Sequence, residues 1–186
     1  MPAATLPPDL HIVVLAAGKG TRMKSALPKV LHRAAGAPLI DHVAGAAESM
    51  KPSSIVVVIG HQTEQLREHF ARRSDVTLAL QEPQLGTGHA LLQAEPFLRG
   101  KTGTVLLLSG DVPLLRAETV RALIEHHVSR GAAATVSVVR STTAIAYHVH
   151  SSQVTHDKKM GIASASLTGQ PPLRPAAATR SARPGC

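Results

Sequence analysis

The sequence has very few aromatic residues and almost no cysteine. Its 186 residues include no tryptophan, two phenylalanines and one tyrosine. Proteins that bind RNA or single strands by stacking bases need aromatic platforms, so this composition argues against that mode of binding. The one cysteine, Cys186, is the last residue, which excludes an internal disulfide framework and a zinc site built from cysteines. A reducing cytoplasm fits these absences.

Long apolar runs and a targeting signal are also missing. The longest apolar stretches, such as 12–17 and 105–108, are far shorter than the roughly 20 residues of a membrane-spanning helix. Residues 1–9 contain three prolines and no basic residue, so they lack the charged start of a signal peptide. We therefore expect no membrane partner.

The net charge of +8 is spread unevenly along the chain. Residues 1–140 hold 15 basic and 11 acidic side chains, whereas residues 141–186 hold 5 basic and 1 acidic. The larger part is thus only mildly basic, as in proteins that handle phosphates. We expect no specific nucleic-acid partner, and the oligomeric state stays open.

Short apolar runs alternate with amphipathic stretches over residues 10–140, which we assign to one domain. Strands are expected at 10–16, 54–60, 76–80, 104–109 and 134–139, and helices at 38–50, 63–72, 87–98 and 117–130. Continuous apolar strands that alternate with helices predict an α/β fold: a mostly parallel, Rossmann-like sheet with helices on both faces. Ligands then bind at the carboxyl ends of the strands.

Residues 141–186 differ from the rest of the chain in composition. Ala, Ser, Thr, Pro, Arg and Gly dominate there, and apolar periodicity is lost. We expect a divergent, low-complexity tail that is largely disordered, with at most one strand near 144–149.

The loop after the first strand is rich in glycine. It reads LAAGKGTRM, and Gly18 and Gly20 would let a phosphate approach the main chain. The spacing excludes the dinucleotide-binding and P-loop patterns. Arg22 can fork onto phosphate oxygens, and Lys29, in the first turn of a short helix, needs an anionic partner such as a ligand. A glycine turn without a ligand and a solvated lysine are the alternatives.

Two later loops carry polar side chains at strand ends. In QEPQLGTGHA, Gln81 can pair with the imide edge of a base, Gly86 permits close approach, and Thr87 can cap the next helix. In SGDVPLL, Asp111 follows an apolar strand and can hold a divalent metal. Capped turns without a ligand remain the alternative for both loops.

Together the three loops resemble the sugar-nucleotide pyrophosphorylases, nucleotidyltransferases with a glycosyltransferase-A-like fold. The motifs LAAGKGTRM with PKVLH, QEPQLGTGHA and GDVPLL occur in the family's order and at its spacing, over roughly residues 10–140. The second motif is most similar to the uridylyltransferase domain of the bifunctional uridylyltransferase/acetyltransferase enzymes. The resemblance ends near residue 140, as in a truncated domain.

The resemblance implies a set of roles. The main chain of four loop residues would hold the nucleotide: Leu15, Ala16, Ala17 and Gly18. Arg22 and Lys29 would neutralise the triphosphate as the catalytic pair. Gln81, Gly86 and Thr87 would read uracil, and Asp111 would bind Mg²⁺. A sugar-1-phosphate, N-acetylglucosamine-1-phosphate, would attack the α-phosphorus of UTP and release pyrophosphate, giving UDP-N-acetylglucosamine for the peptidoglycan of the cell wall.

The sequence also departs from this family. Later residues expected to contact the sugar and complete the Mg²⁺ site are not found, nor is the acetyltransferase domain, and Ser109 stands where an aromatic residue is frequent. These departures favour a truncated domain that binds UTP weakly and catalyses poorly, and two alternatives stay open. One is a nucleotidyltransferase of the same fold that acts on another sugar phosphate or a cofactor precursor. The other is a non-catalytic protein that binds partners through its basic tail.

Overall fold

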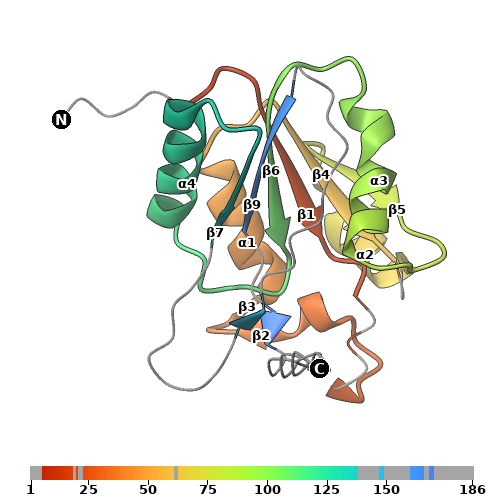
Figure 1. Cartoon of the computed structure of the whole chain (residues 1–186). Coiled ribbons are helices and arrows are strands. Elements are labelled where there is room, and N and C mark those ends of the chain that lie inside the picture. The colour runs from red at the N-terminus through yellow and green to blue at the C-terminus, as the bar shows by residue number, and fades with distance from the viewer. Residues whose placement is uncertain are drawn as a thin grey trace, which may run out of the picture.

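The computed structural model describes residues 6–18, 20, 23–60 and 63–137, together with strand segments at 147–148, 160–165 and 168–169. Its centre is a six-stranded sheet in the order β5-β4-β1-β6-β9-β7, with every pair parallel (Figure 1). The strands of this sheet are β1 (Leu10–Leu15), β4 (Ser54–Ile59), β5 (Val76–Leu80), β6 (Gly103–Ser109), β7 (Ala134–Ser137) and β9 (Met160–Ala165).

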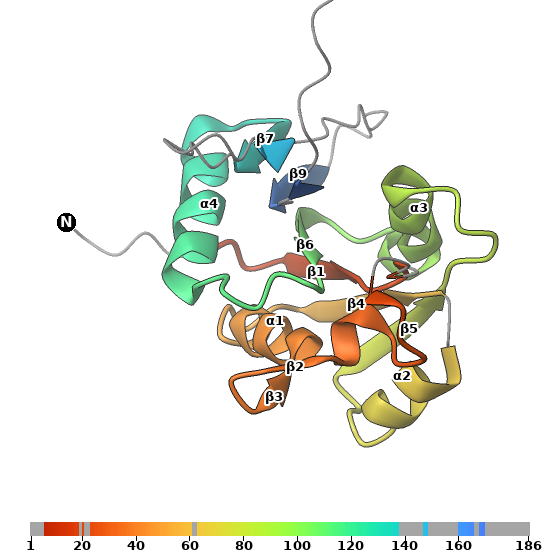
Figure 2. The same ribbon diagram turned by 90° about the horizontal axis from the view of Figure 1, so that it is seen from below.

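Helices cover both faces of the sheet, as the sequence predicts. The helices α1 (Leu39–Glu48), α2 (Thr63–Phe70) and α4 (Ala117–Arg130) contribute to one apolar core, and α3 (Thr87–Leu98) contributes to the other. Figure 2 shows α3 across the sheet from α1 and α2. None of the helices in the described part of the chain is long and apolar enough to cross a membrane.

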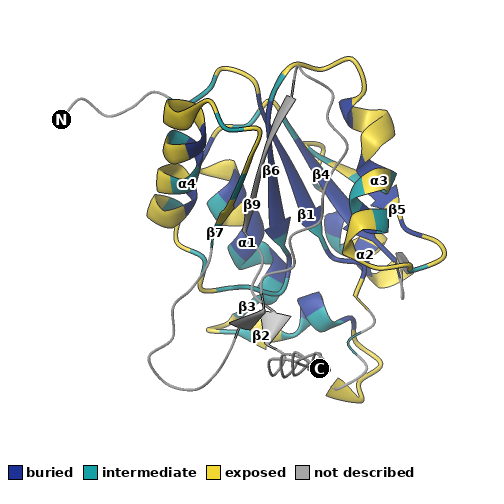
Figure 3. Cartoon of the chain, viewed as in Figure 1, coloured by how far each residue is buried: buried dark blue, intermediate teal, exposed yellow. Residues whose placement is uncertain are grey.

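The central strand β1 is continuously aliphatic from Ile12 to Leu15 because both of its faces are buried. Ile12 and Val14 point into the core shared with α1, α2 and α4, whereas Val13 points into the core shared with α3. All three are fully buried, because both faces of a parallel sheet are covered. The buried colour of β1, β4 and β6 in Figure 3 shows the same arrangement.

Two small antiparallel pairs complete the described structure. The strands β2 (Arg33–Ala34) and β3 (Ala37–Pro38) form a hairpin just before α1, and β8 (Tyr147–His148) pairs with β10 (Thr168–Gly169). The hairpin turn places Ala35 and Gly36 at positive φ, 48° and 86°. The sequence does not predict this hairpin, because two-residue strands carry no periodicity to detect.

The structure differs from the sequence-based predictions at two further points. Thr87 is not the cap of α3: Gly86 occupies the N-cap position at φ 100°, no side chain caps the helix, and Thr87 is its first residue. A positive φ at that position favours glycine over threonine. Strand β9 lies at residues 160–165, within the stretch for which we expect mainly a tail, and it pairs with both β6 and β7.

Candidate nucleotide site

The loops that follow β1, β5 and β6 meet at the carboxyl ends of the strands and enclose a cleft of about 440 Å³. That volume lies within the range of small-molecule sites. Twelve residues line it: Leu15, Ala17, Gly18, Lys29, Val30, Gln81, Gln84, Gly86, Thr87, Ala90, Ser109 and Asp111. The loops converge here because their strands are near neighbours in the sheet.

The end of β1 and the loop after it line the cleft. Leu15, Ala17 and Gly18 are lining residues, whereas Ala16 is buried and donates its N–H to the Val58 carbonyl oxygen at 2.8 Å. Gly20 has φ +58°, and a Cβ there would lie 2.9 Å from the Cβ of Lys29. A glycine is therefore required where this loop approaches the Lys29 segment.

Arg22, the residue of this loop that the sequence predicts to bind phosphate oxygens, lies outside the described residues. Its position relative to the cleft is therefore not described, and its role stays a prediction.

Lys29 opens a 3₁₀ helix, Lys29–Leu31, with Pro28 at the N-cap. The sequence predicts this short helix, in which Pro28 sets the entry of the chain. The Lys29 ammonium contacts Asp111 Oδ2 at 2.5 Å, across 82 residues of sequence. The anion expected beside Lys29 is thus, in the protein alone, an aspartate from the loop after β6.

Both carboxylate oxygens of Asp111 are engaged. Ser109 Oγ donates to Oδ1 at 2.8 Å, and Lys29 binds Oδ2. Burial by itself would raise the pKa of Asp111, but the hydrogen bonds from Lys29 and Ser109, with the charge of Lys29, hold this pKa below its usual value. Asp111 is therefore ionised at neutral pH, and its side chain is 27% exposed toward the cleft.

Gln81 follows β5 and is only 4% exposed although it is polar. Its backbone N–H donates to the Ile59 carbonyl at 2.7 Å, which extends the β4–β5 pairing by one residue. Its side-chain Nε2 donates to the Gly86 carbonyl at 2.9 Å and lies 3.1 Å from His89 Nδ1. The loop from Gln81 to Gly86 is thereby closed on itself beside the cleft.

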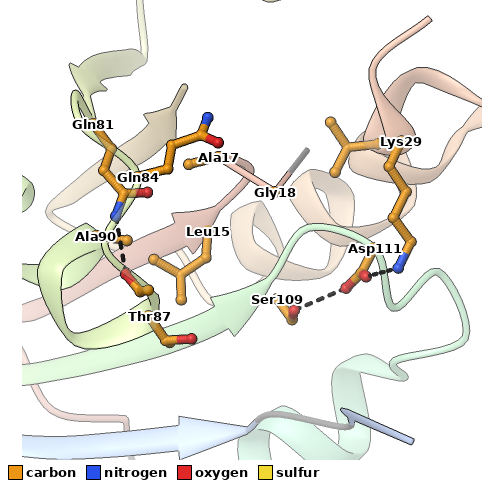
Figure 4. A pocket seen from close by; sticks show the side chains of 12 residues that line it. Leu15, Ala17, Gly18, Lys29, Gln81, Gln84, Thr87, Ala90, Ser109 and Asp111 are labelled. Carbon is orange, nitrogen blue, oxygen red and sulfur yellow. Dashed lines mark hydrogen bonds and ion pairs between the residues drawn. The ribbon is translucent and has the colours of Figure 1, made fainter. Parts of the chain in front are cut away.

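The polar groups fall into two clusters. Figure 4 shows Gln81, Gln84 and Thr87 on one side of the cleft, and Lys29 with Asp111 on the other. Gly18 lies between them in that view. One cluster offers amide groups and the other offers charge, so the cleft suits a ligand with a hydrogen-bonding ring at one end and phosphates at the other.

The sequence does not single out Gln84 or Ser109 as site residues, yet both line the cleft. The Oε1 atom of Gln84 is buried without a hydrogen-bond partner among the described residues. A Cβ at Gly60 would collide with Gln84 Nε2 and lie 3.0 Å from Ala17 Cβ. The sequence feature that could have identified Gln84 is its place in the same motif as Gln81. For Ser109 that feature is its position at the end of the strand β6.

The described residues contain no group of three or more His, Cys, Asp or Glu side chains that could hold a metal ion by themselves. Asp111 is the carboxylate among the cleft-lining residues. Mg²⁺ often binds through one or two carboxylates plus substrate phosphates and water, and it needs no complete cage of protein ligands. One ionised carboxylate fits an ion of that kind.

Comparison with protein families decides the assignment. The model of the MobA-like NTP transferase domain matches residues 12–183, which is most of the chain. The chain belongs to this family. The match runs past residue 140, where the resemblance visible in the sequence ends.

Curated relatives of the family include proteins named "Bifunctional protein GlmU". The protein from Geobacter metallireducens is 52% identical over 139 residues, which cover 75% of this chain and 29% of that protein. The protein from Brevibacillus brevis is 55% identical over 127 residues, which cover 68% and 27% respectively. The chain thus spans less than a third of the length of these relatives.

Solved structures share the fold. A nucleotidyl transferase from Methanothermobacter thermautotroptrophicus superposes with a TM-score of 0.56 at 26% identity, over 64% of this chain and 58% of that one. Rv0371c from Mycobacterium tuberculosis, in a complex with manganese, gives a TM-score of 0.52 at 21% identity, over 69% and 64%. The chain therefore has the α/β nucleotidyltransferase fold.

Proposed function

We propose that this domain transfers UMP from UTP to a sugar-1-phosphate, N-acetylglucosamine-1-phosphate above all, and releases pyrophosphate. One observation carries the proposal: a single cleft at the strand ends holds amide groups on one side and the Lys29–Asp111 pair on the other. The GlmU relatives, near 50% identical over the matched residues, favour this type of nucleotidyltransferase.

In the proposed reaction the protein positions the reactants and compensates charge. An oxygen of the sugar-1-phosphate attacks the α-phosphorus of UTP, a new phosphorus–oxygen bond forms, and the bond to the β-phosphate breaks so that pyrophosphate leaves. Phosphoryl and nucleotidyl transfers need little covalent help from the enzyme, because positioning and electrostatic stabilisation supply most of the acceleration.

Several of the cleft residues have a part in this proposal. Gln81, Gly86 and Thr87 bind the uracil, and the main chain of Leu15 to Gly18 supports the nucleotide. Lys29 leaves Asp111 to bind phosphate oxygens as the catalytic cation, with Arg22 as the second cation predicted from the sequence.

Asp111 would hold Mg²⁺, which, when bound, spreads positive charge over the phosphates and offsets the charge that develops on the leaving pyrophosphate. The ionised, cleft-facing carboxylate of Asp111 fits this ion.

Pyrophosphate release from UTP and N-acetylglucosamine-1-phosphate, with Mg²⁺, tests the proposal. Asp111→Asn should lower the rate by about 100-fold or more, because it removes the carboxylate that would hold the Mg²⁺ ion beside the reacting phosphates. Asp75→Asn is a matched control, since Asp75 is also paired with a cation, Arg73, but does not line the cleft. Equal rates for the two variants would contradict the proposal. Turnover only with a different sugar phosphate or a cofactor precursor would favour the alternative nucleotidyltransferase.

A further inference from the structure

Two side chains of the described part of the chain hold the Asp111 carboxylate, one at each oxygen. Lys29 Nζ lies 2.5 Å from Oδ2, and in the proposed reaction this ammonium moves to the phosphates. Ser109 Oγ donates to Oδ1 at 2.8 Å, and Figure 4 shows the two contacts on opposite sides of the carboxylate. Because the Ser109 hydroxyl is neutral, arriving phosphates compete for it less strongly than for the ammonium. Ser109 is therefore the partner that can stay when Lys29 leaves.

The main chain holds Ser109 in place. Ser109 is the last residue of β6 and pairs with Leu15 of β1 in the middle of the sheet. The following N–H, that of Gly110, donates to the Leu15 carbonyl oxygen at 2.9 Å, and the Val112 N–H donates to the Ser109 carbonyl oxygen at 3.4 Å. The serine hydroxyl is one bond from Cβ, whereas Lys29 carries its charge on a long, flexible stem and is 41% exposed. Ser109 is thus the more rigid of the two partners.

We propose that Ser109 is a positioning residue, which keeps hold of Oδ1 of Asp111 after Lys29 has left, so that Oδ2 is presented to a divalent cation in the cleft. Carboxylates that bind metal ions are themselves hydrogen-bonded by neighbouring groups, and these neighbours set the orientation of the carboxylate. This inference rests on the proposed function, in which Asp111 holds the metal ion, and adds the residue that orients Asp111.

Equilibrium binding of UTP to the full chain, with Mn²⁺ as the divalent cation or with a chelator, tests the proposal without turnover. Calorimetry under both conditions gives the ratio of the two UTP affinities, which measures how much the metal strengthens binding. In Ser109→Ala we expect this ratio to fall by about tenfold, as for other groups that orient a metal ligand. The UTP affinity in chelator should stay unchanged, which also shows that the cleft of the variant is folded.

Three further variants separate positioning from a merely structural role. Ser109→Thr keeps a hydroxyl on the same carbon and should retain the wild-type ratio. Ser129→Ala is a matched control, because Ser129 also donates its hydroxyl to an oxygen, the His126 carbonyl at 3.0 Å, but belongs to α4 and does not line the cleft. In the Asp111→Asn background, Ser109→Ala should cause no further loss, because no carboxylate remains to be held.

The outcomes distinguish this inference from the proposed function. A wild-type ratio in Ser109→Ala, a Ser109→Thr variant as weak as Ser109→Ala, or the same loss from Ser109→Ala in the Asp111→Asn background would each overturn the role of Ser109 while the metal site at Asp111 stands. An equal loss of UTP affinity with and without Mn²⁺ would also overturn it, because Ser109 would then act on the nucleotide directly. A wild-type ratio in Asp111→Asn itself would overturn both proposals.

Discussion

Replacing Lys29 with Met should have opposite effects on two ligands. In the protein alone Lys29 neutralises Asp111, so a divalent cation that binds Asp111 must first displace the ammonium. A triphosphate, by contrast, needs the ammonium for itself. Removal of Lys29 should therefore tighten the binding of a metal ion in the absence of nucleotide and weaken the binding of UTP in the absence of metal.

The magnitudes follow from the exposure of the pair. The side chains are 41% and 27% exposed, so solvent screens the 2.5 Å contact, and we assign it about 0.5–1 kcal/mol. The metal affinity should rise by about two- to fivefold. A hydrogen bond to a charged phosphate contributes about 1.5–3 kcal/mol, so the UTP affinity should fall by about 10- to 150-fold.

Two binding measurements check these signs. Electron paramagnetic resonance of free Mn²⁺ reports metal binding without nucleotide, and calorimetry with a chelator present reports UTP binding without metal. Lys101→Met is the control, because Lys101 precedes β6 and does not line the cleft, and its ammonium donates a hydrogen bond to Ser54 Oγ at 3.3 Å. The double variant Lys29→Met/Asp111→Asn should lose the gain in Mn²⁺ affinity. A Mn²⁺ affinity that falls or stays constant in Lys29→Met would refute the competition between the two cations.

Three further outcomes follow from packing and charge. Leu106 is fully buried in β6, so Leu106→Ala should lower the free energy of unfolding in urea by about 2–5 kcal/mol. Leu92 is 61% exposed, so Leu92→Ala should change that free energy by less than about 0.5 kcal/mol. Equal losses in the two variants would contradict the assignment of Leu106 to the core. Gly110→Ala should destabilise by about 1–3 kcal/mol, because its Cβ would lie 3.0 Å from the Leu15 carbonyl oxygen; an unchanged unfolding midpoint would show that the chain relaxes there. The folded-state pKa of Asp111 is lowered, so its ionised form stabilises the fold above the unfolded-state pKa, and this stabilisation is lost as pH falls through the folded value; unfolding curves of wild type and Asp111→Asn should therefore converge in acid.

Most of the fold could be predicted because its signals are local. The runs at 10–16, 54–60 and 104–109 are continuous and aliphatic, and strands β1, β4 and β6 begin and end within one residue of those bounds. Gly131 ends α4 in the left-handed conformation at φ 54°, as the glycine after the last helical turn predicts. These local sequence features predict the strands and helices, and the alternation of strands with helices predicts a parallel sheet.

What could not be predicted depends on contacts between distant residues. The ion pair of Lys29 with Asp111 joins positions 82 residues apart, and no spacing rule connects them. Strand β9 has the sequence MGIASA, too rich in small residues to mark a strand, and its pairing with β6 and β7 comes from tertiary structure. The orientation of the Gln81 amide is set by its hydrogen bond to the Gly86 carbonyl in the folded loop, whereas the sequence indicates only that an amide is present.

The strand order also bears on how the chain assembles as it leaves the ribosome. Strand β7 reaches the sheet only through β9, which lies between it and β6. When residues up to 140 have emerged, β1, β4, β5 and β6 can already pair, but β7 has no hydrogen-bonding neighbour and β6 is an open edge. Strand β9 covers this edge once residues 160–165 follow, and until then the uncovered edge of β6 is open to pairing between two nascent chains.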